Sequence, residues 1–182
     1  QKEKLIGLIG GDHSSPLGYY KALAEKHGNF GILQIDAHAD LRKDFEGFKY
    51  SHASIMYNSL HEVAEIEKLV QVGVRDYCEE EFEYIHKNSN RVVTFFFYQL
   101  KERSFTGKTW DEEVRDIINH LPEKVHISFD IDGLDPKLCP HTGTPVPGGL
   151  QEQQVLYLFK KLLESGRKLI GFDLVEVVFA QD

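Results

Sequence analysis

The sequence predicts an α/β fold in which a mainly parallel β-sheet lies between two layers of helices. Short apolar runs of β-branched and aromatic residues alternate along the chain with longer amphipathic stretches. Within the apolar runs, polar and apolar residues hardly alternate, as expected for strands covered on both faces. Repeated strand–helix–strand units with right-handed crossovers then give a parallel sheet in a three-layer α/β/α arrangement.

The expected strands are the β-branched or aromatic runs themselves, whose composition favours extended backbone. They lie at Lys4–Ile9, Phe30–Ile35, Leu69–Val74, Arg91–Phe97, Val125–Phe129 and within Lys168–Val178.

The expected helices are the amphipathic stretches between these runs. The first, Pro16–Lys26, has proline in its first turn and Ser14 or Ser15 before it as the cap. Two more are expected at Glu79–His86 and Asp111–Asn119. The last, Gln151–Glu164, has a helical period of apolar residues, at Val155, Leu156, Phe159, Leu162 and Leu163.

Length and composition narrow the class of protein. The 182 residues are enough for one domain with a sizeable core. Because the chain starts at Gln1 and ends at Asp182 just after an apolar run, we expect residues 1–182 to be an incomplete domain of a longer protein, truncated at both ends. The net charge of −8, with basic residues scattered among acids, argues against a nucleic-acid partner. No apolar run approaches the ~20 residues that span a bilayer.

The two cysteines, Cys78 and Cys139, are far apart and form no CxxC pair. A disulfide scaffold or a zinc knuckle is therefore not expected. Both are predicted to be reduced thiols in a cytoplasmic protein.

Acidic residues and histidines follow three of the expected strands. His13 lies in Gly10–Ser14 after the first strand, and Asp36-Ala37-His38-Ala39-Asp40 follows the second. The fifth strand ends at Asp130-Ile131-Asp132. Ligands of open α/β sheets bind outside the carboxyl ends of the strands, so these side chains are expected to converge on one crevice.

We expect such a cluster of acidic side chains to bind cations. Four carboxylates in one place would repel one another and push each other toward protonation. Two divalent ions roughly 3.5–4 Å apart can share bridging carboxylates and hold a hydroxide between them. Oxygen-rich sites with a minority of imidazoles suit Mn²⁺, and Zn²⁺ usually takes fewer ligands. Alternation within Asp36–Asp40 places the three ligand-type side chains on one side of an extended segment, with alanines between them.

These motifs resemble the signatures of the ureohydrolase family, which includes arginases, agmatinases and formimidoylglutamases. The resemblance rests on Gly-Gly-Asp-His-Ser (10–14), Asp-Ala-His-Ala-Asp (36–40) and Ser-Phe-Asp-Ile-Asp-Gly-Leu-Asp-Pro (128–136), with a glycine-rich segment at 142–149. It implies an arginase-like fold, two Mn²⁺ ions and hydrolysis of a guanidinium carbon. It also implies a homo-oligomer, a trimer or a hexamer.

The resemblance implies roles for individual residues. One Mn²⁺ would be held by His13, Asp36, Asp40 and Asp130, and the other by Asp36, His38, Asp130 and Asp132. Glu176 matches the glutamate that receives the guanidinium, His52 the histidine of proton transfer, and Asp40 is counted with them as catalytic. Asp76 matches an acid at the far amino end of the substrate, and Thr144 a threonine of the pocket.

The resemblance implies a small guanidino compound as the substrate. The candidate substrates differ in the chemical group at the end far from the guanidinium. Arg42 stands where arginases carry an asparagine, and Asp40-Leu41-Arg42 with Tyr50–Ser54 looks more like agmatinases. The acids Asp76 and Glu79–Glu81 suit an amine cation, which favours agmatine and its conversion to putrescine and urea.

Several alternatives stay open. Arg42 could capture the carboxylate of arginine, formimidoylglutamate or a guanidino acid unless Asp44 or Glu46 neutralises it. Two other classes are a non-catalytic metal-binding relative and a zinc hydrolase like the histone deacetylases. The presence of both His13 and Asp40 favours two metals over one.

Overall fold

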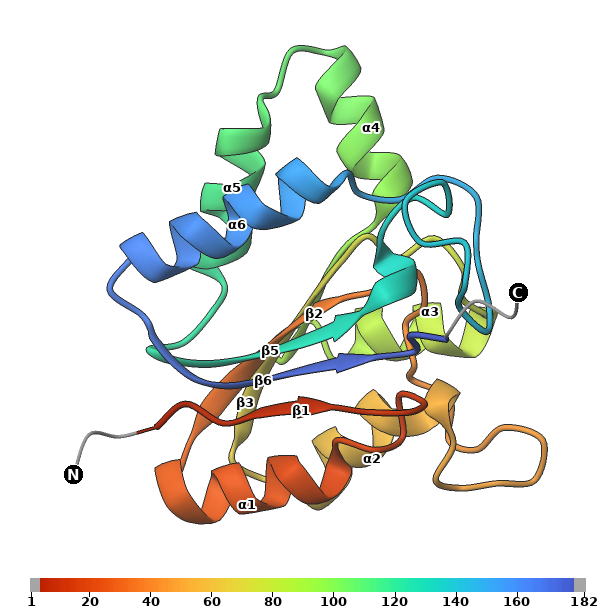
Figure 1. The fold of residues 1–182 in the computed structure, drawn as a ribbon, viewed down its shortest axis with the longest axis vertical. Coiled ribbons are helices and arrows are strands. Elements are labelled where there is room, and N and C mark those ends of the chain that lie inside the picture. The colour runs from red at the N-terminus through yellow and green to blue at the C-terminus, as the bar shows by residue number, and fades with distance from the viewer. Residues whose placement is uncertain (1–3, 179–182) are drawn as a thin grey trace.

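The computed structural model describes residues 4–178 and contains one six-stranded sheet (Figure 1). Its order is β1-β6-β5-β2-β3-β4, and every neighbouring pair is parallel. The strands are β1 (Gly7–Ile9), β2 (Phe30–Ile35), β3 (Ile66–Val72), β4 (Val92–Phe95), β5 (Lys124–Asp130) and β6 (Lys168–Val175). The predicted parallel sheet is confirmed.

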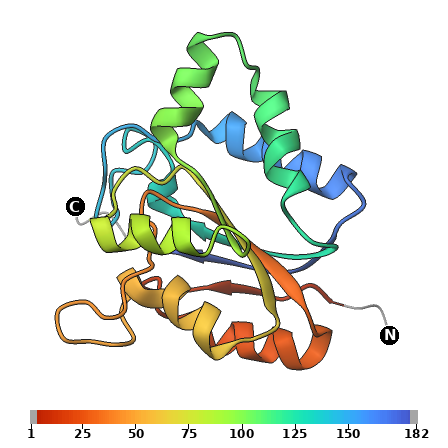
Figure 2. The ribbon, with the colours of Figure 1, turned by 180° about the vertical axis from the view of Figure 1, so that it is seen from behind.

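Helices cover both faces of the sheet (Figures 1 and 2). One layer contains α1 (Leu17–His27), α2 (Ile55–Glu62) and α3 (Glu79–Lys87), and the other contains α4 (Phe97–Phe105), α5 (Trp110–Asn119) and α6 (Glu152–Glu164). The short 3₁₀ helix η1 (His52–Ser54) precedes α2, and η2 (Ile131–Gly133) follows β5 directly. Within residues 4–178, no helix combines the length and the apolar character needed to cross a membrane.

The apolar core consists of two clusters, one on each face of the sheet. Tyr20 and Met56 of the first helical layer pack with sheet residues such as Leu69. Ile117 and Leu158 of the second layer pack against the opposite face. Every residue of β2 is buried, because this strand lies in the middle of the sheet and between the two layers.

The observed elements differ from the predicted ones in several places. β3 begins at Ile66 and ends before Gly73, whose φ of 101° turns the chain out of the sheet. The aromatic run predicted as the strand Arg91–Phe97 ends at Phe95, and Phe97 already begins α4. The helices α2 and α4 were not predicted at all.

The predicted cap of the first helix is wrong. α1 has Pro16 as its N-cap residue and no side-chain capping bond. The hydroxyls of Ser14 and Ser15 instead donate to the side chain and the carbonyl of Asp12. Asp12 thus orders the turn in front of α1.

Gly133, in η2 just after β5, packs tightly against the end of β2. A Cβ atom there would lie 2.8 Å from the backbone nitrogen of Asp36 and 2.9 Å from Ile35 Cγ2. We expect Gly133→Ala in the full-length protein to lower the free energy of unfolding by ~1–3 kcal/mol, because backbone must move to admit the methyl group. Urea denaturation measures this.

Gly18→Ala is the matched control. Gly18 lies in α1 with no heavy atom within 4 Å of the added Cβ, so the same substitution should leave stability unchanged or raise it by up to ~1 kcal/mol. Equal unfolding free energies for the two variants would contradict the close approach at Gly133.

Candidate metal centre and adjoining cavity

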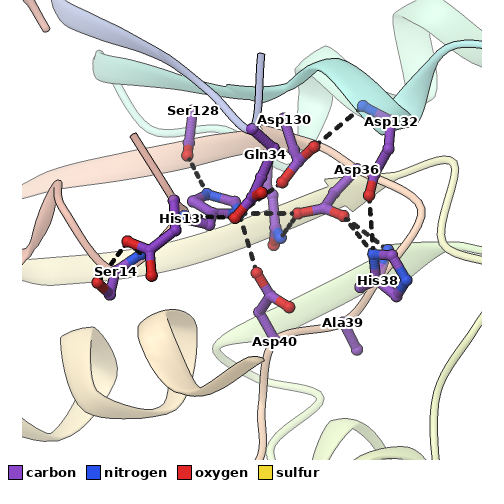
Figure 3. A network of polar contacts seen from close by, with 12 residues as sticks. His13, Ser14, Gln34, Asp36, His38, Ala39, Asp40, Ser128, Asp130 and Asp132 are labelled. Atoms are coloured by element: carbon purple, nitrogen blue, oxygen red, sulfur yellow. Dashed lines mark hydrogen bonds and ion pairs between the residues drawn. The ribbon is translucent and has the colours of Figure 1, made fainter. Parts of the chain in front are cut away.

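Six ligand-type side chains converge at the carboxyl edge of the sheet (Figure 3). His13 follows β1, and Asp130 and Asp132 lie at the end of β5 and in η2. Asp36, His38 and Asp40 come directly after β2. The convergence predicted from the motifs is therefore present, and segments more than a hundred residues apart in the sequence form it.

His13 lies at the centre of the first ligand set. Its Nδ1 is 3.1 Å from Asp36 Oδ2, 2.9 Å from Asp40 Oδ2 and 3.2 Å from Asp130 Oδ2. Nevertheless, this buried nitrogen has no hydrogen-bond partner in the described chain. One nitrogen and three carboxylate oxygens thus face a common point without bonding to one another, as the ligands of a cation do.

A second ligand set shares Asp36 with the first. His38 Nδ1 lies 3.1 Å from Asp132 Oδ2 and 3.5 Å from Asp36 Oδ1. The donor atoms of His13, Asp36 and Asp130 lie close enough together to hold one ion, as do those of Asp36, His38 and Asp132. The residues therefore fit two neighbouring divalent cations, with Asp36 between them.

Backbone amides fix the orientation of these carboxylates. His38 N donates to Asp36 Oδ1 at 2.6 Å, and Asp132 N donates to Asp130 Oδ1 at 3.0 Å. Ala37 N donates to Asp132 Oδ1 at 3.0 Å. In each carboxylate the other oxygen, Oδ2, faces an imidazole of the cluster. The alternating motifs therefore place side chains and also supply the N–H groups that orient them.

A row of polar residues crosses the sheet beneath the cluster. The parallel register places side by side Asp173, Ser128, Gln34, Gln71 and Thr94, one each from β6, β5, β2, β3 and β4. Ser128 Oγ donates to Asp173 Oδ1 at 2.9 Å and lies 2.9 Å from His13 Nε2. Asp173 also accepts from Tyr20 and pairs with His126, at 3.1 and 2.6 Å. Ser128 therefore accepts the Nε2–H of His13, which leaves Nδ1 to face the cluster.

The other half of the row supports Asp36. Gln34 Nε2 donates to Asp36 Oδ2 at 2.7 Å, and Gln71 Nε2 donates to Gln34 Oε1 at 2.7 Å. Thr94 Oγ1 donates to Gln71 Oε1 at 2.7 Å. This chain fixes the carboxylate that both ligand sets share.

Charge is strongly redistributed within the cluster. Burial opposes a charge on His38, but hydrogen bonds to Asp132 and Asp36 raise the pKa of His38 to about 11. Burial also opposes ionisation of Asp36, yet the adjacent imidazoles of His13 and His38 lower the pKa of Asp36. Burial and the charge of Asp36 raise the pKa of Asp40 to about 7. Protonated imidazoles thus balance the negative charge of the carboxylates, as bound metal cations would.

Two of the predicted catalytic residues have left-handed backbone. Asp40 has a φ of 53° and Glu176 a φ of 61°, conformations that non-glycine residues adopt rarely and mainly at functional sites. Glu176 lies just after β6, and its Oε1 accepts a hydrogen bond of 2.8 Å from the backbone N–H of His13. This bond brings Glu176 beside the first ligand set.

A cavity of about 140 Å³ opens next to the cluster. Its lining includes the ligand-type residues His38 and Asp40 and four residues predicted from the sequence, namely Arg42, His52, Asp76 and Thr144. The ring of His52 packs edge-on against Phe45, with 5.5 Å between ring centroids. The cavity therefore collects most of the residues predicted to meet the substrate.

One predicted substrate-binding residue lies elsewhere. Glu79 is exposed at the start of α3 and is not among the residues lining this cavity, where Glu81 takes its place. Asp76 lines the cavity, but its side chain is 63% exposed and Oδ2 lies 3.8 Å from His38 Nε2. Asp76 is therefore placed to orient a ligand-type histidine as well as to face the substrate.

Arg42 is paired with a buried carboxylate. Its Nε lies 3.7 Å from Glu81 Oε2, and its guanidinium carbon lies 5.3 Å from the centre of the Phe45 ring. Glu81 also accepts from the backbone N–H groups of Leu41 and Cys78, both at 2.9 Å. Among the described ion pairs, the partner of Arg42 is thus Glu81, and the pairing with Asp44 or Glu46 considered from the sequence is absent.

The sequence analysis missed several residues that support the cluster. Ser128 contacts the ring of His13 and fixes its orientation, while Asp12 accepts a hydrogen bond from Ser14. Gln34 and Ser128 lie two residues before Asp36 and Asp130 on the same strands, and this spacing was the signal for them. The contact of Glu81 with Leu41 spans 40 residues, and no local pattern indicates it.

Comparisons with known proteins agree with this geometry. The family model described as "Arginase family" matches residues 1–182. The chain is 37% identical over 174 residues to the N(1)-aminopropylagmatine ureohydrolase of Thermus thermophilus, covering 96% of this chain and 55% of that protein. It is 35% identical over 177 residues to the guanidinobutyrase of Pseudomonas aeruginosa, covering 93% of this chain and 51% of the relative.

The fold is similar to that of solved structures. The proclavaminate amidino hydrolase of Streptomyces clavuligerus matches with a TM-score of 0.78 and 33% identity over 94% of this chain and 54% of the other. This chain thus spans about half the length of the proteins that it matches. The match over all 182 residues, together with the shared fold, shows that the chain belongs to the arginase family.

Proposed function

We propose that this chain is the metal-binding and catalytic part of a ureohydrolase that uses two Mn²⁺ ions, with agmatine as its substrate. One observation carries the proposal. His13 Nδ1 is buried, lacks a hydrogen-bond partner in the described chain and faces three carboxylate oxygens at 2.9–3.2 Å. Without a metal ion, this buried nitrogen would have no bonding partner, which is rare for buried polar groups.

The proposed ligands of one ion are His13, Asp36, Asp40 and Asp130, and those of the other are Asp36, His38, Asp130 and Asp132. This donor set is rich in carboxylate oxygen with two imidazoles and no thiolate, which suits Mn²⁺. When bound, the two ions would act as Lewis acids and lower the pKa of the attacking water.

The residues around the metal centre have the remaining tasks. Glu176 holds the planar guanidinium through its carboxylate, next to His13. Asp40, which faces both the cluster and the cavity, orients the attacking water by a hydrogen bond. As the bond from the guanidinium carbon to the alkyl-bearing nitrogen breaks, His52 gives that nitrogen a proton. The products are urea and an amine.

The partner of Arg42 supports agmatine as the substrate. Arg42 shares its charge with the buried carboxylate of Glu81, so the cavity presents little net attraction to a substrate carboxylate. The exposed acid Asp76 lines the cavity and adds negative potential there, which favours an amine.

A guanidino acid is the second candidate. Arg42 lines the cavity, and its side chain is 38% exposed and able to turn toward a carboxylate. Arginine and formimidoylglutamate would use Arg42 in the same way.

We also propose a homo-oligomeric, trimeric or hexameric, cytoplasmic enzyme without nucleic-acid or membrane partners. Cys78 and Cys139 are both free, as expected in a reducing compartment. Sedimentation of the full-length protein tests its oligomeric state.

The proposed bridging role of Asp130 predicts an asymmetry between two variants. In the full-length protein, Asp130→Ala should lose both Mn²⁺ ions, whereas His13→Ala should weaken one ion and retain the other. Metal analysis after dialysis counts the bound ions. Asp44→Ala, an exposed carboxylate outside the cluster, is the control and should keep both. Two tightly held ions in Asp130→Ala would refute the bridging assignment.

The pairing of Arg42 with Glu81 predicts the substrate preference. Hydrolysis of agmatine should exceed that of arginine, guanidinobutyrate and formimidoylglutamate. Arg42→Ala should change the ratio of kcat/KM values only modestly, because partly exposed charge pairs contribute ~0–1 kcal/mol. Urea release measures the first three reactions, and formamide release measures the last.

Lys43→Ala serves as the charge-matched control, since Lys43 is exposed beside Arg42. Agmatine is the wrong substrate if two results are found together. The wild-type protein would prefer a substrate with a carboxylate, and Arg42→Ala would lose roughly 2–5 kcal/mol of transition-state binding with that substrate but not with agmatine.

A further inference from the structure

Arg75 lies just after β3, at the edge of the sheet that carries the metal centre. Its side chain donates to carbonyl oxygens of several separate segments. Nη2 lies 2.7 Å from Asp132 O and 2.9 Å from Val146 O, and Nε lies 3.2 Å from Pro147 O. Each hydrogen bond that its guanidinium makes in residues 4–178 goes to a backbone carbonyl.

The backbone of Arg75 is itself tied to the metal centre. The N–H groups of Arg75 and Asp76 both donate to Ala37 O, at 2.8 and 3.0 Å. Ala37 lies between two ligand-type residues, Asp36 and His38. The position of the guanidinium is therefore set from the same segment that carries the shared carboxylate.

Phe97 supports the same contact. The guanidinium carbon of Arg75 lies 5.7 Å from the centre of the Phe97 ring. A Cβ atom at Gly148 would lie 2.7 Å from the same ring, so the end of the loop rests on it. Gly148 has a φ of 86°, which only glycine adopts readily.

The loop held in this way, residues 142–149, borders the cavity. Thr144 lines the cavity, and its Oγ1 lies 3.5 Å from Asp132 Oδ2. A Cβ atom at Gly143 would lie 3.4 Å from Glu176 Oε2. A shift of this loop would thus move one wall of the cavity and a neighbour of the proposed guanidinium-binding carboxylate.

We infer that Arg75 is a positioning residue of the substrate cavity. Its guanidinium joins residues 142–149 to the turn that carries Asp132 and thereby sets the distance between Thr144 and the metal centre. The expected effect of Arg75 on substrate binding rests on the proposed function, whereas its contact with residues 142–149 does not. Arginine suits this task because its planar fork of five donors reaches several acceptors at once, which a lysine ammonium cannot do in the same geometry.

Arg91 offers a matched control on the far edge of the sheet. It also is half-buried and donates to three backbone carbonyls, those of Ile66, Leu60 and Val63, at 2.8, 2.8 and 3.4 Å. It precedes β4 and lies at the amino end of the strands, away from the cavity. Loss of its bonds should cost stability without moving the loop 142–149.

The experiment compares Arg75→Lys and Arg91→Lys in the full-length protein loaded with Mn²⁺. Hydrogen exchange of the peptide segment 142–150 is measured first, without substrate. We expect Arg75→Lys to raise exchange in this segment by roughly tenfold or more, because the loop opens locally, and Arg91→Lys to leave it unchanged. Steady-state kinetics with the preferred guanidino substrate follow. In Arg75→Lys, KM should rise by roughly tenfold with kcat within about threefold.

The two measurements test separate claims: hydrogen exchange tests the contact with the loop, and kinetics test the role in the cavity. Wild-type exchange in the segment 142–150 of Arg75→Lys would overturn the inference, whatever the activity. Faster exchange with an unchanged KM, or an equal rise of KM in Arg91→Lys, would overturn the role in the cavity. If the wild-type protein hydrolyses no guanidino compound, the proposed function fails, and the exchange data still decide whether Arg75 holds the loop.

Discussion

The concentration of negative charge at the carboxyl edge of the sheet is the constraint on which the structure depends. Asp36, Asp40, Asp130 and Asp132 are all buried within reach of His13 or His38. Such a group is stable only if each oxygen has a donor or a cation. Backbone N–H groups bind one oxygen each on Asp36, Asp130 and Asp132, and imidazoles or cations must satisfy the rest.

The sheet meets this constraint through its register. The five longer strands align Asp173, Ser128, Gln34, Gln71 and Thr94 in one row. One hydrogen-bonded chain runs from Asp173 through Ser128 to His13, and a second runs from Thr94 through Gln71 and Gln34 to Asp36. A strand interior with polar residues is costly unless each polar group is paired, and here each member of the row has a partner. The same row lies between the apolar part of the sheet and the ligand-type cluster. Along the strands, the hydrophobic core is therefore followed directly by the metal centre.

The parts of this arrangement that depend on local sequence could be predicted. β2 was predicted with its observed bounds because Phe30–Ile35 is apolar apart from Gln34. The three motifs at strand ends followed from a general rule about parallel sheets. The start of α4 was missed because Phe95, Phe96 and Phe97 continue the aromatic pattern of a strand, and only the contact of Phe97 N–H with Val74 O shows that the chain has turned. The pairing of Arg42 with Glu81 and the contacts of Arg75 with residues 132–147 join distant segments, and local periodicity carries no information about them.

The order of strands has a consequence for how the protein is made. β1 pairs in the described sheet only with β6, so Gly7 gains its neighbour Phe172 only when that much later strand has formed. His13, which follows β1, cannot join Asp36 and Asp130 in a finished centre until residues 168–175 have been synthesised. Until then β2, β3 and β4 can assemble, but Asp36 and Asp40 lack the imidazole of His13. A complete metal centre therefore requires β6, and before that strand has formed, the carboxylates lie at an acidic and incomplete edge of the sheet.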